Sequence, residues 1–410
     1  MRDSEEKIVI TGLGVIAPNA IGKEDYWQAL NDGLDGVKKI TQFDTSDFKV
    51  KHAAECSSFD AKEILGKKGL RNIDRKTLLL CCAAKMALDD AGYSITEENN
   101  ADIGASTGTT LSVAWDMLKF TQEMVDEGPN MVNPALFPPT TMNFPSSQMS
   151  IKFGMRGFNT TISTGYTASL DALAYAITQI RDKRVSASLV CGVESLSISN
   201  FIGFDRIGFL AGINGPELSC PFDQRHNGII LGEGSAVLLV ESERSALSRG
   251  AHIYAEVSDL SFSFDSYRTM KYSRNPAGLI TAIKNLLHSK NILSQEIDSI
   301  FLSANSATIQ DYHEAQVVKE IFRDIDVPAC AIKSMIGETI SADGCFQIAA
   351  ALGAMKNNKI YPTINLKKKD PSCDINVSKK SRDKKQDRIL ITGYGPGGHS
   401  AAVFLNKYEK

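Results

Sequence analysis

Residues 160–176 read TTISTGYTASLDALAYA. A β-branched run ends in a turn of small residues, and a segment with helical apolar periodicity follows at once. A strand–turn–helix of this kind directs the side chain at its tip, Tyr166, out of the turn and places it at a helix N-terminus, where partial positive charge lowers the pKa of a thiol. A neutral phenol with a pKa of about 10 is a poor acyl nucleophile. On these residues alone, a helix start with a space-filling tyrosine is the alternative interpretation.

The rest of the chain alternates in the same way between strand-like and helix-like segments. Alternation of this kind predicts mostly parallel sheets covered by helices on both faces. The pattern occurs twice, so we expect an N-terminal half, residues 1–250, and a C-terminal half, residues 251–410, that share one core. The expected strands are 7–16, 101–108, 160–164, 187–193, 234–241, 252–260 and 297–303, with a strand–turn–strand over 388–405. The expected helices are 24–32, 75–91, 111–125, 168–180, 276–288 and 345–355.

Composition excludes several classes of protein. The 410 residues are 43% hydrophobic and 23% charged, which is ordinary for a globular protein, and a net charge of −3 disfavours a general nucleic-acid binder. The charged N-terminus runs straight into a strand and no run of 18 apolar residues occurs, so we expect no signal peptide, no membrane span and a cytoplasmic location. Eight cysteines without paired spacing predict buried free thiols. No spacing of cysteine and histidine predicts a metal site, and no cofactor is expected.

Six motifs, in order along almost the whole chain, carry a resemblance to a known family. The chain resembles the β-ketoacyl-acyl carrier protein synthases, the condensing enzymes of fatty acid and type II polyketide synthesis. The resemblance implies the thiolase fold, an α/β fold of two similar halves in an α-β-α-β-α core, and an obligate dimer. The motifs are ITGLGVIAP (10–18), FPPTTMN (137–143), PFDQRHNGIILGEGSAVLLVE (221–241), KSMIGE (333–338), YPTINL (361–366) and YGPGGHS (394–400).

The family's catalytic positions are altered in this sequence. The resemblance places Tyr166 where condensing enzymes carry the nucleophilic cysteine, and Asn305 and Glu338 where they carry two histidines. Lys333, the family's lysine, is retained. We expect an anionic Glu338 to repel a developing enolate rather than donate a hydrogen bond to it.

A proline alters the site in a further way. Condensing enzymes hold the thioester oxyanion with two backbone N–H groups, one of them from the second residue of a GFGG turn. That residue is Pro396 here, which has no N–H. Loss of one such donor costs roughly 3–4 kcal/mol.

A condensing-enzyme scaffold without its chemistry resembles the chain length factor, or ketosynthase β subunit, of type II polyketide synthases. The resemblance implies a heterodimer with an active ketosynthase α subunit, a shared acyl tunnel whose length sets that of the product, and an acyl carrier protein that docks mainly on the partner. Tyr166 departs from the glutamine usual there. Two alternatives stay open: a variant ketosynthase or malonyl decarboxylase that primes the chain, and a purely structural partner.

Two groups of residues complete the expected site. Leu111, Ala114, Trp115 and Leu118 are spaced to share one helical face. The resemblance places that face along the acyl tunnel, whereas spacing alone favours core packing. Lys67, Lys68 and Arg71, with Arg75 and Lys76 beside them, form a basic cluster that either contacts the acidic carrier protein or is a solvated helix start. His313 is expected at the surface.

Overall fold

The computed structural model describes residues 6–70, 73–267, 271–323 and 325–409, and it shows the same strand order twice. In the N-terminal half the order is β6-β5-β7-β8-β1, and in the C-terminal half it is β11-β10-β14-β15-β9. Numbered within each half, both orders run third, second, fourth, fifth, first. The strands are β1 (Ile8–Ala17), β5 (Ile103–Gly108), β6 (Asn159–Ile162), β7 (Ala187–Glu194), β8 (Gly234–Ser242), β9 (Ala255–Phe264), β10 (Ser299–Phe301), β11 (Ala329–Cys330), β14 (Arg388–Tyr394) and β15 (His399–Lys407).

The two halves join into one mixed sheet because β1 pairs with β9 through Val9 and Ile10. The outer pairs, β6-β5-β7 and β11-β10-β14, are parallel, and the inner pairs are antiparallel. Two similar halves with a common core are therefore confirmed, while the boundary at residue 250 stays a prediction. Short strands flank this sheet: β2 (Ala20–Ile21), β3 (Lys38–Lys39), β4 (His52–Ala53), β12 (Lys359–Ile360) and β13 (Arg382–Asp383).

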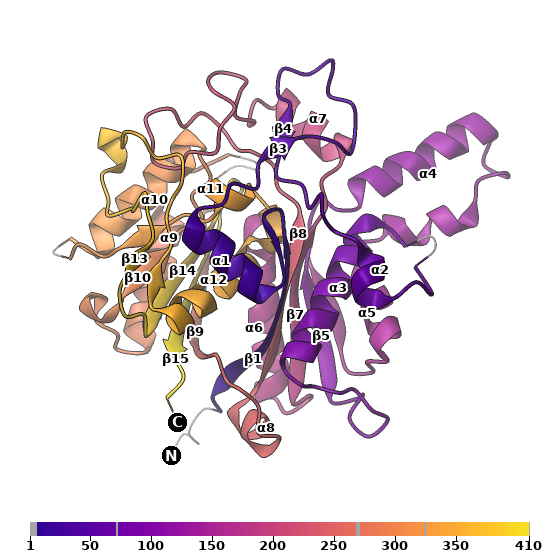
Figure 1. Ribbon diagram of the computed structural model, residues 1–410, viewed down its shortest axis with the longest axis horizontal. Coiled ribbons are helices and arrows are strands. Elements are labelled where there is room, and N and C mark those ends of the chain that lie inside the picture. Colours follow the sequence, from indigo (N-terminus) through magenta and orange to yellow (C-terminus); the bar gives the residue numbers. More distant parts are fainter. Residues whose placement is uncertain (1–5, 71–72, 268–270, 324, 410) are drawn as a thin grey trace.

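Helices cover the sheet in layers (Figure 1). Helices α3 (Arg75–Asp90) and α5 (Phe144–Phe153) lie outside the N-terminal half, and α9 (Ala277–Ser289) and α10 (Thr308–Ile321) lie outside the C-terminal half. Helices α6 (Ala168–Arg181) and α12 (Asp343–Asn357) contact each other between the two halves, and α12 is buried from Asp343 to Met355. The remaining helices are α1 (Lys23–Asp32), α2 (Ala61–Leu65), α4 (Ala114–Glu127), α7 (Ile198–Arg206), α8 (Glu243–Ser248) and α11 (Lys333–Ile336).

Close approach of backbone segments explains part of the glycine pattern in the strands. A Cβ atom on Gly14 would lie 1.9 Å from the carbonyl oxygen of Ala83, so only glycine lets α3 lie this close to β1. Gly108 plays the same part between β5 and the start of α6, where a Cβ would lie 2.4 Å from the backbone nitrogen of Ser169. The close approach at Gly108 places the end of β5 directly beside the turn that carries Tyr166.

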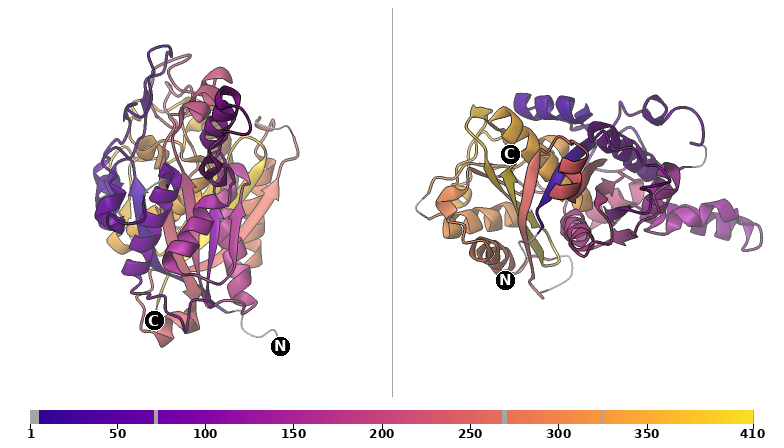
Figure 2. Two further views of the ribbon diagram at one scale, coloured as in Figure 1. Left: turned by 90° about the vertical axis from the view of Figure 1, so that its right-hand side faces the viewer. Right: turned by 90° about the horizontal axis from the view of Figure 1, so that it is seen from below.

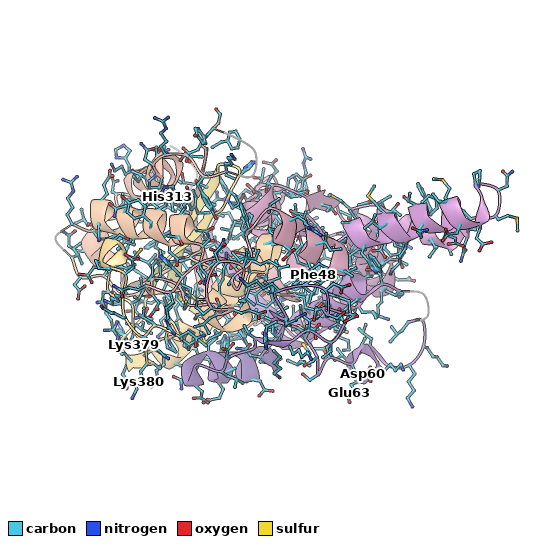
Figure 3. All side chains as sticks on the ribbon, turned by 90° about the horizontal axis from the view of Figure 1, so that it is seen from above. Phe48, Asp60, Glu63, His313, Lys379 and Lys380 are labelled. Carbon is cyan, nitrogen blue, oxygen red and sulfur yellow. The ribbon has the colours of Figure 1, made fainter. Side chains whose placement is uncertain are left out.

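Helix α4 differs from the other long helices because it projects away from the body of the protein (Figure 2). None of its residues is buried, and most of its length stands away from the body of the molecule (Figure 3). A projecting helix in a single chain commonly marks a contact with another chain when its surface is apolar.

Most expected elements are confirmed to within three residues at each end, and two findings differ from expectation. The helix expected from residue 111 begins at Ala114, so Leu111 lies before it and does not share its face. Helices α5 and α10 had not been predicted over their full lengths, because each carries a weak hydrophobic pattern. All eight cysteines are free and buried, as expected. Within the described ranges, no helix is long and apolar enough to cross a membrane.

The exposed edge strand β6 leads to the first prediction. β6 ends the sheet, its side chains are only partly covered, and an unpaired β-branched edge favours association. We expect the chain purified alone to self-associate or precipitate, as measured by light scattering at micromolar concentration. A stable, monodisperse monomer would show that neither this edge nor α4 requires a partner.

Candidate functional site

Tyr166 lies where the sequence predicts, in a single turn between β6 and α6. Gly165 has a φ of +79°, a left-handed conformation that favours glycine, and the turn Gly165–Thr167 leads directly into α6. The Tyr166 side chain is only 6% exposed. The tip of the turn therefore points into the protein and carries a ring that fills space there.

Two groups hold the Tyr166 ring in place. A Cβ atom on Gly395 would lie 2.3 Å from Cγ of Tyr166, so the ring packs directly on the backbone of the turn after β14. On another side, Nζ of Lys333 lies 5.8 Å from the ring centroid, within the range of a cation–π interaction.

Lys333 is the centre of a buried charged cluster. Its Nζ lies 2.9 Å from Oε2 of Glu338, 3.0 Å from Oδ2 of Asp343 and 3.1 Å from Oγ of Ser303. All four side chains are at most 1% exposed. Burial alone would lower the pKa of Lys333, but the carboxylates of Asp343 and Glu338 outweigh it and raise that pKa, so the lysine stays charged. Its three donors are all used within the protein.

Glu338 is satisfied by the same cluster and by its neighbours. Nδ2 of Asn305 donates to Oε2 of Glu338 at 2.7 Å, and the backbone N–H of Ile340 donates to Oε1 at 2.7 Å. Lys333 and Asn305 therefore partly compensate the negative charge of Glu338, and the expected repulsion of an enolate by Glu338 stays a prediction. Asn305, Lys333, Glu338 and the ring of Tyr166 do come together, as the resemblance implied.

The electrostatics of this cluster keep Tyr166 neutral. Burial, followed by the carboxylates of Glu338 and Asp343, raises the pKa of Tyr166 well above its ordinary value. Burial also raises the pKa of Asp343. A phenol in this setting can donate a hydrogen bond, but it does not become a phenolate nucleophile near neutral pH.

The turn Gly395–Gly398 offers no oxyanion donor at Pro396, which is buried and lacks an N–H. The next N–H, from Gly397, is already bonded to the carbonyl oxygen of Lys271 at 3.3 Å. His399 is exposed and its ring packs on Phe264, with ring centroids 4.7 Å apart. His399 therefore takes no part in the cluster around Lys333.

A mainly apolar cavity of about 460 Å³ lies against Tyr166. None of the eight cysteines lines it. Its walls come from the segment between α7 and β8, from residues around 270 and from the start of α10. They are Gly208, Phe209, Asn227, Gly228, Ile229, Tyr267, Lys271, Tyr272, Ala307, Thr308 and Ile309.

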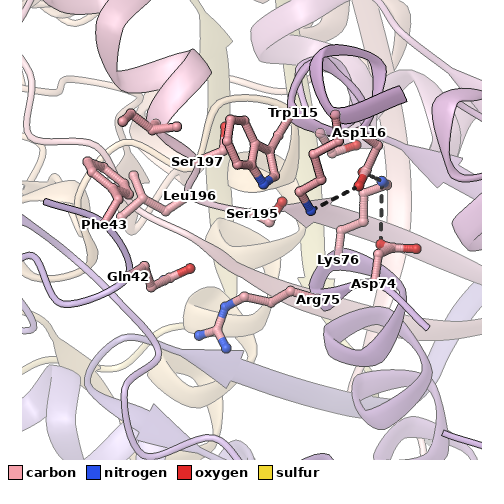
Figure 4. A pocket seen from close by; sticks show the side chains of 13 residues that line it. Gln42, Phe43, Asp74, Arg75, Lys76, Trp115, Asp116, Ser195, Leu196 and Ser197 are labelled. Atoms are coloured by element: carbon pink, nitrogen blue, oxygen red, sulfur yellow. Dashed lines mark hydrogen bonds and ion pairs between the residues drawn. The ribbon is translucent and has the colours of Figure 1, made fainter. Parts of the chain in front are cut away.

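Trp115 lines a second, smaller pocket at the base of α4, with a volume of about 210 Å³ (Figure 4). Asp116 forms an ion pair with the buried Lys76, which also lies 3.4 Å from Asp74. Nζ of Lys119 lies 5.2 Å from the centroid of the Trp115 ring. These contacts tie the first turns of the projecting helix to α3.

Trp115 and Leu118, two of the expected tunnel residues, do not lie in the core of this chain, contrary to what spacing alone favours. Trp115 is 38% exposed and Leu118 is 52% exposed, and Ala114 begins the same unburied helix. Leu111 packs instead against a neighbouring apolar cluster that includes Tyr166. The exposed faces of Trp115 and Leu118 are therefore available for contact with another chain.

The basic cluster is smaller than the sequence indicates. Lys67 and Lys68 are exposed, and Arg71 lies outside the described residues. Arg75 pairs with Glu233 at 2.5 Å, and the cation of Lys76 is buried. Neither of the last two is free to meet an acidic partner.

Sequence reasoning missed several residues of the site. His313 is buried rather than at the surface, its Nδ1 lies 2.9 Å from the hydroxyl of Tyr394, and burial lowers its pKa. Asp343 and Ser303 both contact Nζ of Lys333, but no pattern in the sequence identified them as site residues. Gln310 bridges Asn305 to the backbone carbonyl of Tyr394, a contact that no spacing pattern indicates.

Two family models account for most of the chain. Residues 5–246 match the N-terminal domain of the β-ketoacyl synthases, and residues 254–367 match their C-terminal domain. The chain belongs to the β-ketoacyl synthase family. The resemblance noted from the motifs is thereby confirmed.

The relatives of this chain include 3-oxoacyl-[acyl-carrier-protein] synthases and subunits of polyketide synthases. A 3-oxoacyl-[acyl-carrier-protein] synthase 2 of Coxiella burnetii is 32% identical over 98% of this chain and 99% of its own length. The tetracenomycin polyketide synthase ketoacyl synthase alpha subunit of Streptomyces glaucescens is 31% identical over 98% of each chain.

Solved structures confirm the thiolase fold. The ishigamide ketosynthase/chain length factor matches with a TM-score of 0.92 and 28% identity, covering 99% of this chain and 100% of that chain. A β-ketoacyl synthase from Burkholderia phymatum, at 22% identity, has the same fold with a TM-score of 0.90 over 98% of this chain and 100% of that chain.

The buried cluster leads to the second prediction. Lys333→Met would leave Glu338 and Asp343 buried without a cation, so we expect a loss of about 3–5 kcal/mol in the free energy of unfolding. The double variant with Glu338→Gln should recover part of this loss, because one of the two carboxylates is then removed.

Denaturant unfolding at one fixed protein concentration measures both variants. Lys284→Met is the matched control: Lys284 is exposed and pairs with Glu320, and its loss should cost less than about 1 kcal/mol. A Lys333→Met variant as stable as this control would mean that the ammonium does not hold the site together.

Proposed function

We propose that this chain is a non-catalytic chain length factor, the β subunit of a type II polyketide ketosynthase. In this proposal it pairs with an active ketosynthase α subunit, bounds the acyl tunnel at their interface and limits the length of the polyketide. An acyl carrier protein delivers substrate mainly to the partner. The chain is then a subunit of an acyltransferase complex and not an enzyme by itself.

The single observation that carries the proposal is the setting of Tyr166. By resemblance it occupies the position of the nucleophilic cysteine, and it is buried, neutral and packed against a fully paired Lys333. Glu338 and Asn305 stand at the two histidine positions and bond to each other instead of facing a substrate. With Pro396 in the turn, the nucleophile, one histidine donor and one oxyanion donor are all missing.

The apolar surface of α4 supports the proposal that a partner subunit packs against this helix. Apolar side chains that stand in solvent on a projecting helix are costly unless a partner covers them. They continue beyond the helix into residues 131–142. The exposed apolar residues of this segment are Trp115, Met117, Leu118, Met124, Val125, Met131, Phe137 and Met142.

Two relatives have names that belong to this kind of complex, one of them as a chain length factor and the other as an alpha subunit. The ishigamide protein is described as a ketosynthase/chain length factor, and the tetracenomycin relative as an alpha subunit. We extend the pairing of such subunits to this chain. Leu111, Ala114, Trp115 and Leu118 are then the tunnel residues, and Lys67, Lys68 and Arg71 are the possible carrier-protein contacts.

The third prediction tests whether Trp115 limits chain length. A rigid indole at the tunnel end would have to be displaced by each further two-carbon unit, and overpacking of this kind costs ~1–3 kcal/mol, enough to bias elongation by roughly tenfold or more. We expect Trp115→Ala, co-expressed with an intact ketosynthase α subunit, to give longer products without loss of turnover. Mass spectrometry of the products measures their length.

Met117→Ala is the matched control, because Met117 is exposed on the same helix but does not line the pocket of about 210 Å³ beside Trp115. It should leave product length unchanged. If the Trp115→Ala, Leu111→Ala and Leu118→Ala complexes all assemble, turn over normally and give the original length, the chain is a structural partner and not the ruler.

A further inference from the structure

Glu194 is a buried carboxyl group outside the cluster around Lys333. It is the last residue of β7, it is 2% exposed, and it lines neither the cavity beside Tyr166 nor the pocket beside Trp115. The two residues that follow it, Ser195 and Leu196, do line the pocket beside Trp115 (Figure 4). Glu194 can therefore act on a chain in these spaces only through its neighbours.

Two backbone N–H groups of the segment before α4 converge on one oxygen of Glu194. The N–H of Thr110 donates to Oε1 at 2.6 Å, and the N–H of Leu111 donates to the same atom at 3.1 Å. The sheet explains this position, because Gly108 at the end of β5 pairs with Gly192 of β7. The two strands end side by side, and the chain that leaves β5 runs past the carboxyl group at the end of β7.

The same oxygen of Glu194 also accepts a hydrogen bond from the hydroxyl of Ser341. Ser341 lies in the short helix η5 (Ile340–Ala342). Ile340 has a φ of +51°, a strained conformation for a β-branched residue, and its N–H donates to Glu338 at 2.7 Å. Glu194 thus joins the segment before α4 to η5, and through η5 to the buried charged cluster.

The backbone position of Leu111 determines where its side chain lies. Leu111 is partly buried and packs against an apolar cluster that contains Tyr166, Leu196 and Ile340. Its carbonyl oxygen accepts from the N–H of Ala114 at 3.2 Å, in the turn that leads into α4. A shift of the Leu111 backbone would therefore move both the side chain and the first turn of the helix.

Three contacts hold this segment along its length. At one end the N–H of Thr109 donates to the carbonyl oxygen of Ile162 at 3.1 Å, and at the other end Asp116 pairs with Lys76. Glu194 holds the middle of the segment, where the side chain of Leu111 leaves the backbone.

The carboxyl group of Glu194 accepts these bonds whether or not it carries a proton. Burial raises its pKa to about 7, and the buried Oε2 has no hydrogen-bond partner among the described residues. A proton on Oε2 leaves Oε1 free to accept all three bonds. A glutamine keeps such an acceptor oxygen, whereas a methionine of similar length does not.

We propose that Glu194 is a positioning residue for chain length: its carboxyl oxygen fixes Leu111 through the N–H groups of Thr110 and Leu111, so that this wall of the tunnel does not yield to a growing chain. This role rests on the proposed function, because Leu111 affects product length only if this chain bounds the tunnel. Removing the acceptor leaves two buried N–H groups unpaired, which favours displacement of the segment.

Co-expression of Glu194 variants with an intact ketosynthase α subunit, followed by mass spectrometry of the products, tests this role. We expect Glu194→Met to raise the ratio of longer to original products about threefold to tenfold, because the restraint that is lost is that of one neutral hydrogen bond or more. A general loss of activity does not mimic this result, since the ratio is independent of the total amount of product. Glu194→Gln should restore the original ratio.

Glu320→Met is the matched control. It replaces a partly exposed glutamate of α10 that pairs with Lys284, far from the segment before α4 in sequence and in the fold. It should leave the product ratio unchanged.

Hydrogen–deuterium exchange of the same complexes gives a readout that does not depend on turnover. In Glu194→Met, exchange of the amides in residues 109–113 should rise roughly tenfold or more, while α9 stays protected. In Glu194→Gln, exchange should match that of the unmodified chain. Glu194→Asp withdraws the carboxylate by one methylene and should give an intermediate result in both measurements, which keeps the role testable if Glu194→Met does not assemble.

The role of Glu194 is overturned if Glu194→Met and Glu194→Asp keep the original ratio, or if Glu194→Gln alters it as much as Glu194→Met. It is also overturned if neither Glu194→Met nor Glu194→Asp assembles, since Glu194 then serves folding. When Leu111→Ala changes product length in the same assay, each of these results leaves the proposed function standing. When Leu111→Ala, Trp115→Ala and Leu118→Ala all keep the original length, the proposed function fails, and the role of Glu194 fails with it.

Discussion

The buried ammonium of Lys333 is the interaction around which the candidate site is arranged. It connects three parts of the chain that are distant in sequence: Ser303 after β10, Glu338 after α11 and Asp343 at the first turn of α12. Burying an ion costs several kcal/mol unless its partners are well placed, so this cation requires both carboxylates to stay where they are. Burial, followed by those two carboxylates, raises the pKa of Tyr166 and keeps it protonated, and Lys333 lies beside its ring.

The polar side chains around Lys333 are bonded mainly to one another. In a condensing enzyme the same cavity needs a nucleophile, free donors and an oxyanion hole. Here Lys333 and Asn305 both donate hydrogen bonds to Glu338. The turn against which Tyr166 packs contains Pro396, which has no N–H to donate. The parts of the chain that other molecules can still reach are the edge strand β6, the projecting helix α4 and the cavity in front of Tyr166.

Much of this could be predicted from the sequence, because short-range patterns determine it. The strand–turn–helix at Tyr166, the repeated alternation and the motif positions of Asn305, Lys333 and Glu338 all placed residues correctly. The compensation of Glu338 could not be foreseen, since Asp343 joins the cluster through the packing of α12 and not through any spacing. Arg75 and Lys76 looked like surface cations because their partners, Glu233 and Asp116, are far away in sequence. The exposure of Trp115 depends on where α4 points, which residue periodicity does not encode.

The account's central claim is that this chain carries no acyl group in its own site. The direct test is intact-mass spectrometry of the purified complex after incubation with an acyl-carrier protein thioester, with both subunits observed in one spectrum. The account predicts that the partner ketosynthase gains the mass of the acyl group while this chain, including Tyr166, stays unmodified. A stoichiometric acyl adduct on this chain, mapped to Tyr166 or Lys333, would contradict it.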